Sequence, residues 1–254
     1  MATFIFAASV SRAQQTNVHS DPALNYKSGM ELFQQEKYGA AQEKFRQAII
    51  DFRNPGEAKN HLLLLEALFF DARCSKILDR PDAEKLLLDI INNYEENATT
   101  RLVYFHLADL YFDQKKYDKS ITWYKKVDPA DLTSSEKTEY NFQFGFSYFY
   151  KKEFDKAKPY FSEVKSLKGE YYYPANYYYG YISYKQGSYK EALSSFREVE
   201  KSELYKGIVP YYIANIYYQE KKYDDVINYA KGFTSEDKLQ YGLEMQQLTG
   251  KSYF

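Results

Sequence analysis

One short pattern recurs along the chain and constrains its fold more than any other feature. An aromatic residue is followed three positions later by a small residue and, four positions after that, by a second aromatic residue. The copies are Tyr38, Ala41 and Phe45; Tyr117, Ser120 and Tyr124; Phe154, Ala157 and Phe161; Tyr189, Ala192 and Phe196; and Tyr223 with Val226, which keep the first half. Another small residue precedes each copy's small residue by twelve positions: Gly29, Ala108, Gly145, Gly180 and Ala214. Five copies with one spacing predict a repeat protein.

The length and periodicity of the unit predict pairs of helices. The small residues at 41, 83, 120, 157, 192 and 226 are separated by 42, 37, 37, 35 and 34 residues, the length of two helices with their turns. Apolar residues recur three and four apart, as in Tyr104, Leu107, Ala108 and Tyr111, and strands would instead show alternation. Because Gly or Ala lets two helix backbones approach, we expect the small residues to mark the contact within each pair.

The order of small residue, polar turn, aromatic residue, small residue and aromatic residue resembles the tetratricopeptide repeat. The resemblance extends from Asp21 to Phe254, so we expect residues 21–254 to form one repeat domain. It implies an all-α fold, a right-handed superhelical solenoid of stacked antiparallel helix pairs, with about six repeats and a partial seventh. The second repeat departs most, because Asp71 replaces Gly or Ala and Arg80 replaces an aromatic residue. Looser or shifted packing is expected there.

The C-terminal residues repeat the spacing of a first helix. Gly250 and Tyr253 are spaced as Gly145 and Tyr148 are, so we expect residues 243–254 to be the first helix of a seventh pair. The second helix of that pair would then lie beyond the sequence. An uncapped apolar end of this kind can associate with other molecules, and a homo-oligomer through this end is one outcome.

The N-terminal residues have features of a targeting segment. Ala2 to Val10 is a short apolar run, and Ser11, Arg12 and Ala13 place small residues three and one before Gln14. We therefore predict a signal peptide over residues 1–13 and a linker over 14–20, with a periplasmic or envelope-associated protein. No Lys or Arg precedes the run, so the alternative is a leader without function in a cytoplasmic protein.

Charge and side-chain inventory exclude several classes of function. The chain has 34 Lys plus Arg and 35 Asp plus Glu, which predicts neither nucleic acid nor anionic membrane as a partner. No segment is long and apolar enough for a transmembrane helix. His19, His61 and His106 have no ligand-spaced companions, and Cys74 is interpreted as a buried small residue. We predict no catalytic site, no metal, no cofactor and no enzymatic activity.

A second set of residues recurs on the first helices, separate from the small residues. Its members stand four and then three positions apart, so each triplet lies on one face of its helix. The triplets are Phe105, Asp109 and Phe112; Phe142, Phe146 and Phe149; Tyr177, Tyr181 and Tyr184; and Tyr211, Asn215 and Tyr218. In the tetratricopeptide family this face lines a concave groove. We call these twelve residues the aromatic stripe; they either bind a partner or pack against the neighbouring repeat.

The function predicted from these features is a non-catalytic scaffold for protein interactions. The aromatic stripe would hold an extended peptide or a partner protein, with Asp109 and Asn215 as polar handles. The tyrosine-rich repeats behind a leader resemble, loosely, bacterial envelope repeat proteins such as the barrel-assembly lipoprotein subunit and the periplasmic partner of the Tol-Pal system. The alternative is a sensory or ligand-binding module of a larger signal-transduction protein.

Overall fold

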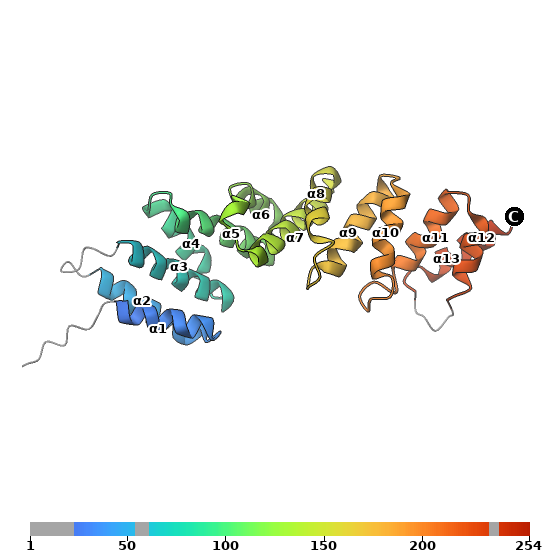
Figure 1. Cartoon of the computed structure of the whole chain (residues 1–254). Coiled ribbons are helices and arrows are strands. Elements are labelled where there is room, and N and C mark those ends of the chain that lie inside the picture. Colours follow the sequence, from blue (N-terminus) through green and yellow to red (C-terminus); the bar gives the residue numbers. More distant parts are fainter. Residues whose placement is uncertain (1–22, 54–60, 234–238) are drawn as a thin grey trace, which may run out of the picture. The chain divides into compact units, whose positions relative to one another are not determined.

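The computed structural model describes residues 23–53, 61–233 and 239–254, and its regular structure there is entirely helical. The predicted signal peptide and linker therefore lie outside the described residues. Two compact units are present, Met1–Leu86 and Leu87–Phe254, and each is described by itself. Figure 1 labels the α-helices: α1 Ala23–Gln34, α2 Tyr38–Phe52, α3 His61–Ile77, α4 Ala83–Asn93, α5 Ala98–Asp113, α6 Tyr117–Tyr124, α7 Ser134–Tyr150, α8 Phe154–Val164, α9 Tyr172–Lys185, α10 Tyr189–Val199, α11 Val209–Gln219, α12 Tyr223–Ala230 and α13 Gly242–Ser252.

The first unit is built from α1, α2 and α3, which pack on one another, and from the first residues of α4. Phe45 of α2 is fully buried, lies stacked on Phe70 of α3 with ring centres 5.4 Å apart, and covers Gly29 of α1. Cys74 of α3 is fully buried beside them, as its interpretation as a small core residue predicted. Burial raises the pKa of its thiol to about 12.

The second unit repeats one arrangement four times. The pairs α5 and α6, α7 and α8, α9 and α10, and α11 and α12 each pack together, and each second helix also contacts the first helix that follows it. Helix α13 packs against both α11 and α12. The expected first helix of a seventh pair is thus present, within two residues of its predicted start at residue 243. The all-α fold predicted from the repeat is confirmed for the described residues.

Small residues mark the close contact within a pair, as expected. A methyl group placed on Gly29 would lie 2.7 Å from the Phe45 ring, and one on Gly180 would lie 3.0 Å from the Phe196 ring. On Gly145 it would lie 3.0 Å from the β-carbon of Tyr160. The covering ring at Gly29 and Gly180 is the second aromatic residue of the second helix. The repeated sequence pattern therefore reflects a contact in which an aromatic ring of the second helix packs on the small residue of the first helix.

Two first helices of the second unit begin at residues suited to a helix start. Thr133 and Glu136 form a reciprocal capping box at α7, each side chain accepting from the other's backbone N–H. Pro210 occupies the first turn of α11, where a missing N–H removes no helical hydrogen bond. The capping box fixes the start of α7, and with it the positions of the residues that follow on the faces of that helix.

The atypical second repeat is held by polar contacts. Asp71, at the position of Gly or Ala in the other repeats, is buried in α3. Its Oδ1 accepts hydrogen bonds from Gln42 Nε2 at 2.8 Å and Arg46 Nε at 3.0 Å, both from α2. Burial raises the pKa of this carboxyl, and the two donors oppose that shift. A charged side chain is tolerated here because donors on the neighbouring helix satisfy it.

Candidate partner-binding surface

The aromatic stripe lies on the first helices of the second unit, three residues each on α5, α7, α9 and α11. Its members differ in exposure. Phe105, Asp109, Phe142 and Asn215 are buried. The other eight are partly buried: Phe112, Phe146, Phe149, Tyr177, Tyr181, Tyr184, Tyr211 and Tyr218. The structure therefore divides the stripe into a packed part and a part that solvent reaches.

The buried members connect neighbouring helices. Phe105 is only 1% exposed and its ring centre lies 6.3 Å from that of Tyr124 on α6. Phe142 is stacked on Tyr171, with ring centres 4.6 Å apart. These two rings therefore pack against neighbouring segments, the second of the two roles expected for the stripe. They offer little surface to a partner.

Asp109 belongs to a buried polar network between α5, α6 and α7. Its side chain is buried, and Oδ1 accepts a hydrogen bond from Gln143 Nε2 at 3.1 Å. Gln143 Oε1 in turn accepts from the Tyr124 hydroxyl, and Gln143 Nε2 also donates to Glu139 at 2.9 Å. Burial, with Asp109 nearby, raises the pKa of Tyr124 well above its ordinary value. The carboxylate predicted as a polar handle is thus engaged between helices of its own chain.

Asn215 joins α9 to α11 in a similar way. The Tyr184 hydroxyl donates to Asn215 Oδ1 at 2.9 Å, and Asn215 Nδ2 donates to the Tyr211 hydroxyl at 3.4 Å. Three members of the stripe therefore hold one another in place across two repeats. Side chains fixed in this way lose little conformational freedom when a partner binds.

The partly buried rings form a continuous series of edge contacts from α5 to α11. The ring of Phe112 meets Phe146 at 5.6 Å, and Phe149 meets Tyr181 at 5.6 Å, both in a T-shaped geometry. Tyr181 and Tyr184 meet Tyr212 of α11 at 5.7 and 5.3 Å. Edge-to-face geometry is one of the arrangements that aromatic pairs prefer, so these contacts stabilise the series.

Three tyrosines outside the predicted stripe extend its C-terminal half. Tyr205, in the segment between α10 and α11, stacks on Tyr177 with ring centres 4.4 Å apart. Tyr241, just before α13, meets Tyr211 at 5.1 Å and Tyr212 at 6.1 Å. Burial raises the pKa of Tyr177 to about 12, and it raises the pKa of Tyr205 and Tyr212 further. These hydroxyls stay protonated at physiological pH and can both donate and accept hydrogen bonds.

The described residues contain no group of three or more His, Cys, Asp or Glu side chains placed to hold a metal ion. Within the same ranges, no helix has the length and apolar character needed to span a membrane. His106 is buried in α5 with its ring 5.1 Å from that of Phe105, and His61 is exposed at the start of α3. His106 therefore packs within the second unit.

The sequence was compared with models of known protein families. Residues 103–128, which run from α5 through α6, match the model of the tetratricopeptide repeat family. The chain contains a tetratricopeptide repeat and has the tetratricopeptide-repeat fold. A search of curated proteins gives no match.

Solved structures with the same fold are similar over most of the chain. A mutant form of MamA superimposes with a TM-score of 0.53 at 17% identity, covering 70% of this chain and 94% of its own. The apo form of RapI gives 0.54 at 18% identity, covering 91% of this chain and 74% of its own. PilF of Pseudomonas aeruginosa gives 0.55 at 14% identity, covering 91% and 97%. These superpositions show that the tetratricopeptide-repeat fold is shared.

Proposed function

We propose that the protein is a scaffold that binds another protein, and that the contact surface is the tyrosine-rich half of the aromatic stripe on α9 and α11. The observation that carries the proposal is the set of partly exposed, mutually fixed rings on these helices. Tyr177, Tyr181, Tyr184 and Tyr211 lie together, with Tyr205 and Tyr241 stacked or tilted against them.

The chemistry of these side chains suits an extended peptide or a partner helix. A tyrosine ring offers apolar area, and its protonated hydroxyl can pair with a peptide group. Tyrosine is enriched among the residues that dominate binding energy at protein interfaces. The hydrogen bond from Tyr184 to Asn215 fixes part of the surface before binding, which lowers the entropic cost of association.

A binding role fits the placement of the chain's reactive side chains. Cys74 is buried in the first unit with a raised pKa, and His106 is buried in the second beside Phe105. A thiol needs to be ionised and accessible to act as a nucleophile, and this one is neither. We therefore propose that the protein acts through binding and not through catalysis.

We also propose that the protein functions in the cell envelope. The support is the apolar run from Ala2 to Val10 followed by Ser11, Arg12 and Ala13, in residues that lie outside the described part of the chain. Expression of the full chain in a bacterium with a periplasm tests this directly. If the protein is exported, the periplasmic fraction should contain a product whose mass corresponds to a chain that starts at Gln14. An uncleaved product in the cytoplasm would refute the proposal.

The binding surface can be tested with peptides selected from a random phage-displayed library against the full chain. Affinities of the selected peptides are then measured for the wild type and for Tyr177→Ala/Tyr181→Ala/Tyr184→Ala. We expect a loss of at least about tenfold, the effect of removing interface rings worth roughly 1 to 2 kcal/mol. Tyr179→Ala is the matched control, since Tyr179 is partly buried on the same helix but about 200° round from Tyr177.

The Ala variant also removes packing, so a second variant separates binding from stability. Replacing the same three residues with Phe keeps the rings and removes the hydroxyls. If the melting temperature of a variant stays near that of the wild type and its affinity for the peptides still falls, the surface binds through the groups that the variant lacks: the rings in the Ala variant, the hydroxyls in the Phe variant. Unaltered affinity in both variants, or an equal loss in Tyr179→Ala, would refute the assignment.

A further inference from the structure

Lysines and aromatic rings lie together on α5 and α6. Tyr104 of α5 is stacked on Trp123 of α6, with ring centres 5.9 Å apart. The Lys126 ammonium lies 4.3 Å from the centre of the Trp123 ring and 5.6 Å from that of the Tyr104 ring. Further along the same two helices, the Lys119 ammonium lies 4.7 Å from the centre of the Tyr111 ring. We call these five residues the basic patch.

The basic patch is a surface separate from the aromatic stripe. Lys119, Trp123 and Lys126 stand four and then three positions apart, so the two lysines flank the tryptophan along one side of α6. Both lysines are exposed and Trp123 is partly buried. Tyr104 and Tyr111 each stand one residue before a member of the stripe, which puts them about 100° round α5 from it.

Positive charge is concentrated in this segment, although the whole chain has a formal net charge of -1. Residues 115–126 contain five lysines and one acidic residue, Asp118. Asp118 is paired with Lys151 at 2.7 Å, and Asp131, which follows the segment, accepts hydrogen bonds of 2.7 and 2.9 Å from Arg101. These two carboxylates are thus engaged with cations outside the basic patch. The segment therefore keeps an excess of positive charge.

We propose that the basic patch binds an acidic segment of a partner protein, in which carboxylates flank an apolar side chain. The carboxylates pair with Lys119 and Lys126, and the apolar side chain packs on Trp123 between them. Both ammonium groups rest on aromatic rings, so their positions are restricted before the partner arrives. Association then costs less conformational entropy.

A protein segment suits the basic patch better than a nucleic acid does. Single-stranded nucleic acid binds proteins by stacking its bases on aromatic faces. Here Tyr104 stacks on Trp123 and Lys126 lies over both rings, which leaves less ring face for a base. The net charge of -1 also gives the whole molecule no long-range attraction for a polyanion.

A designed acidic peptide tests the proposal, and the single tryptophan of the chain reports where the peptide binds. The peptide is three copies of Glu-Glu-Leu-Glu. Its labelled form is titrated with the full chain by fluorescence anisotropy, and its unlabelled form is used to follow the emission of Trp123. We expect saturable binding that changes this emission and that weakens as the salt concentration is raised.

Two double variants place the binding site. Lys119→Gln/Lys126→Gln should lower affinity for the peptide about five- to tenfold, the effect of losing two exposed ion pairs. Lys115→Gln/Lys125→Gln removes the same charge from exposed lysines of the same segment that lie outside the basic patch. This control should lower affinity less than about twofold, because salt screens exposed charges that make no direct contact. Circular dichroism and melting temperature check that both variants fold as the wild type does.

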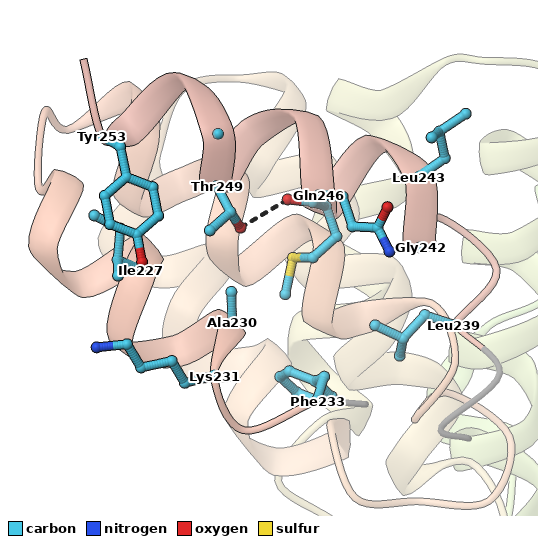
Figure 2. A pocket seen from close by; sticks show the side chains of 12 residues that line it. Ile227, Ala230, Lys231, Phe233, Leu239, Gly242, Leu243, Gln246, Thr249 and Tyr253 are labelled. Atoms are coloured by element: carbon cyan, nitrogen blue, oxygen red, sulfur yellow. Dashed lines mark hydrogen bonds between the residues drawn. The ribbon is translucent and has the colours of Figure 1, made fainter. Parts of the chain in front are cut away.

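An apolar hollow between α12 and α13 is a second place where the leucines of the peptide can bind. It has a volume of about 750 Å³, and Lys231 is the only charged side chain among the described residues that line it (Figure 2). Binding there would not depend on carboxylates. The same peptide with Gln in place of every Glu is therefore the control, and it should leave the emission of Trp123 unchanged.

Four outcomes would overturn the proposal. They are the absence of saturable binding, binding that leaves the emission of Trp123 unaltered, an equal loss of affinity in the two double variants, and an equal change of emission with the Gln peptide. A short oligothymidylate and phosphatidylserine vesicles are titrated in parallel. If either binds the patch as tightly as the acidic peptide does, the patch is not specific for an acidic protein segment.

Discussion

At the scale of single residues, the turns between paired helices use a left-handed backbone conformation at one fixed position. Glu36, Lys115, Lys152 and Lys221 have φ angles of 59°, 58°, 61° and 60°, and each stands two residues before the first aromatic residue of the second helix. In the fifth such turn the position is Gly187, with φ of 74°. A side chain in this conformation costs roughly 1 to 2 kcal/mol, and glycine avoids that cost.

The left-handed turns predict a stabilising substitution. Lys115→Gly should raise the free energy of unfolding by about 0.5 to 1 kcal/mol, because relief of strain exceeds the extra entropy of glycine in the unfolded chain. Gln114→Gly is the control, since Gln114 has φ of −76° and glycine there should only destabilise. Urea denaturation measures both. A loss of stability in Lys115→Gly equal to that of the control would contradict this interpretation of the turns.

The single thiol predicts a chemical test of the first unit. Cys74 is fully buried, with a pKa raised to about 12 by desolvation, and is the only Cys in the sequence. Iodoacetamide at pH 8 should therefore label the native protein on the order of 100-fold more slowly than the protein in urea. The extent of labelling is read by mass spectrometry. Rates within a few-fold of each other would show that α3 does not protect this residue.

At the scale of helices, the contact between small residue and ring carries the pairing. Phe45 is fully buried above Gly29, so its ring has little room to move away from an added methyl group. Gly29→Ala should lower the free energy of unfolding by about 1 to 3 kcal/mol through overpacking. Gly39→Ala, also in a helix but with nothing within 4 Å, should raise it by about 0.5 to 1 kcal/mol. Thermal denaturation measures both variants. If Gly29→Ala were more stable than Gly39→Ala, the close contact between helices would not be at Gly29.

The helices could be predicted from the sequence because their signals are periodic. Gly29, Gly145 and Gly180 stand twelve residues before the small residue of the second helix, and that constant spacing fixes the pairing of the two helices. Asp71 could not be interpreted in the same way. Its burial depends on Gln42 and Arg46, which lie 29 and 25 residues away and belong to no repeated pattern.

The candidate surface could be predicted only in part, for a related reason. Spacing on a helix shows which side chains share a face, and it does not show how much of that face the next repeat covers. Phe105 and Phe142 therefore carry the stripe's pattern but are buried. Tyr205 and Tyr241 extend the surface from segments between helices, where no period exists to reveal them.

At the scale of the whole molecule, packing is between neighbours in sequence order. From α5 to α13 each helix contacts the helices next to it, and the stripe is continuous because the rings of successive first helices meet. In such an array stability is close to a sum of neighbouring terms. One face of the array holds the helix pairs together, and the partly exposed rings of the stripe form the proposed contact surface.

Hydrogen exchange of the full chain, with and without a saturating library-selected peptide, tests the central claim most directly. If the exposed rings of the stripe are the contact surface, bound peptide should slow exchange of backbone amides in α9 and α11 and leave α10 and α12 unchanged. The first helices carry the stripe and the second helices do not. Slowed exchange confined to α10 and α12, or exchange unaltered throughout the second unit, would contradict a binding function for this face.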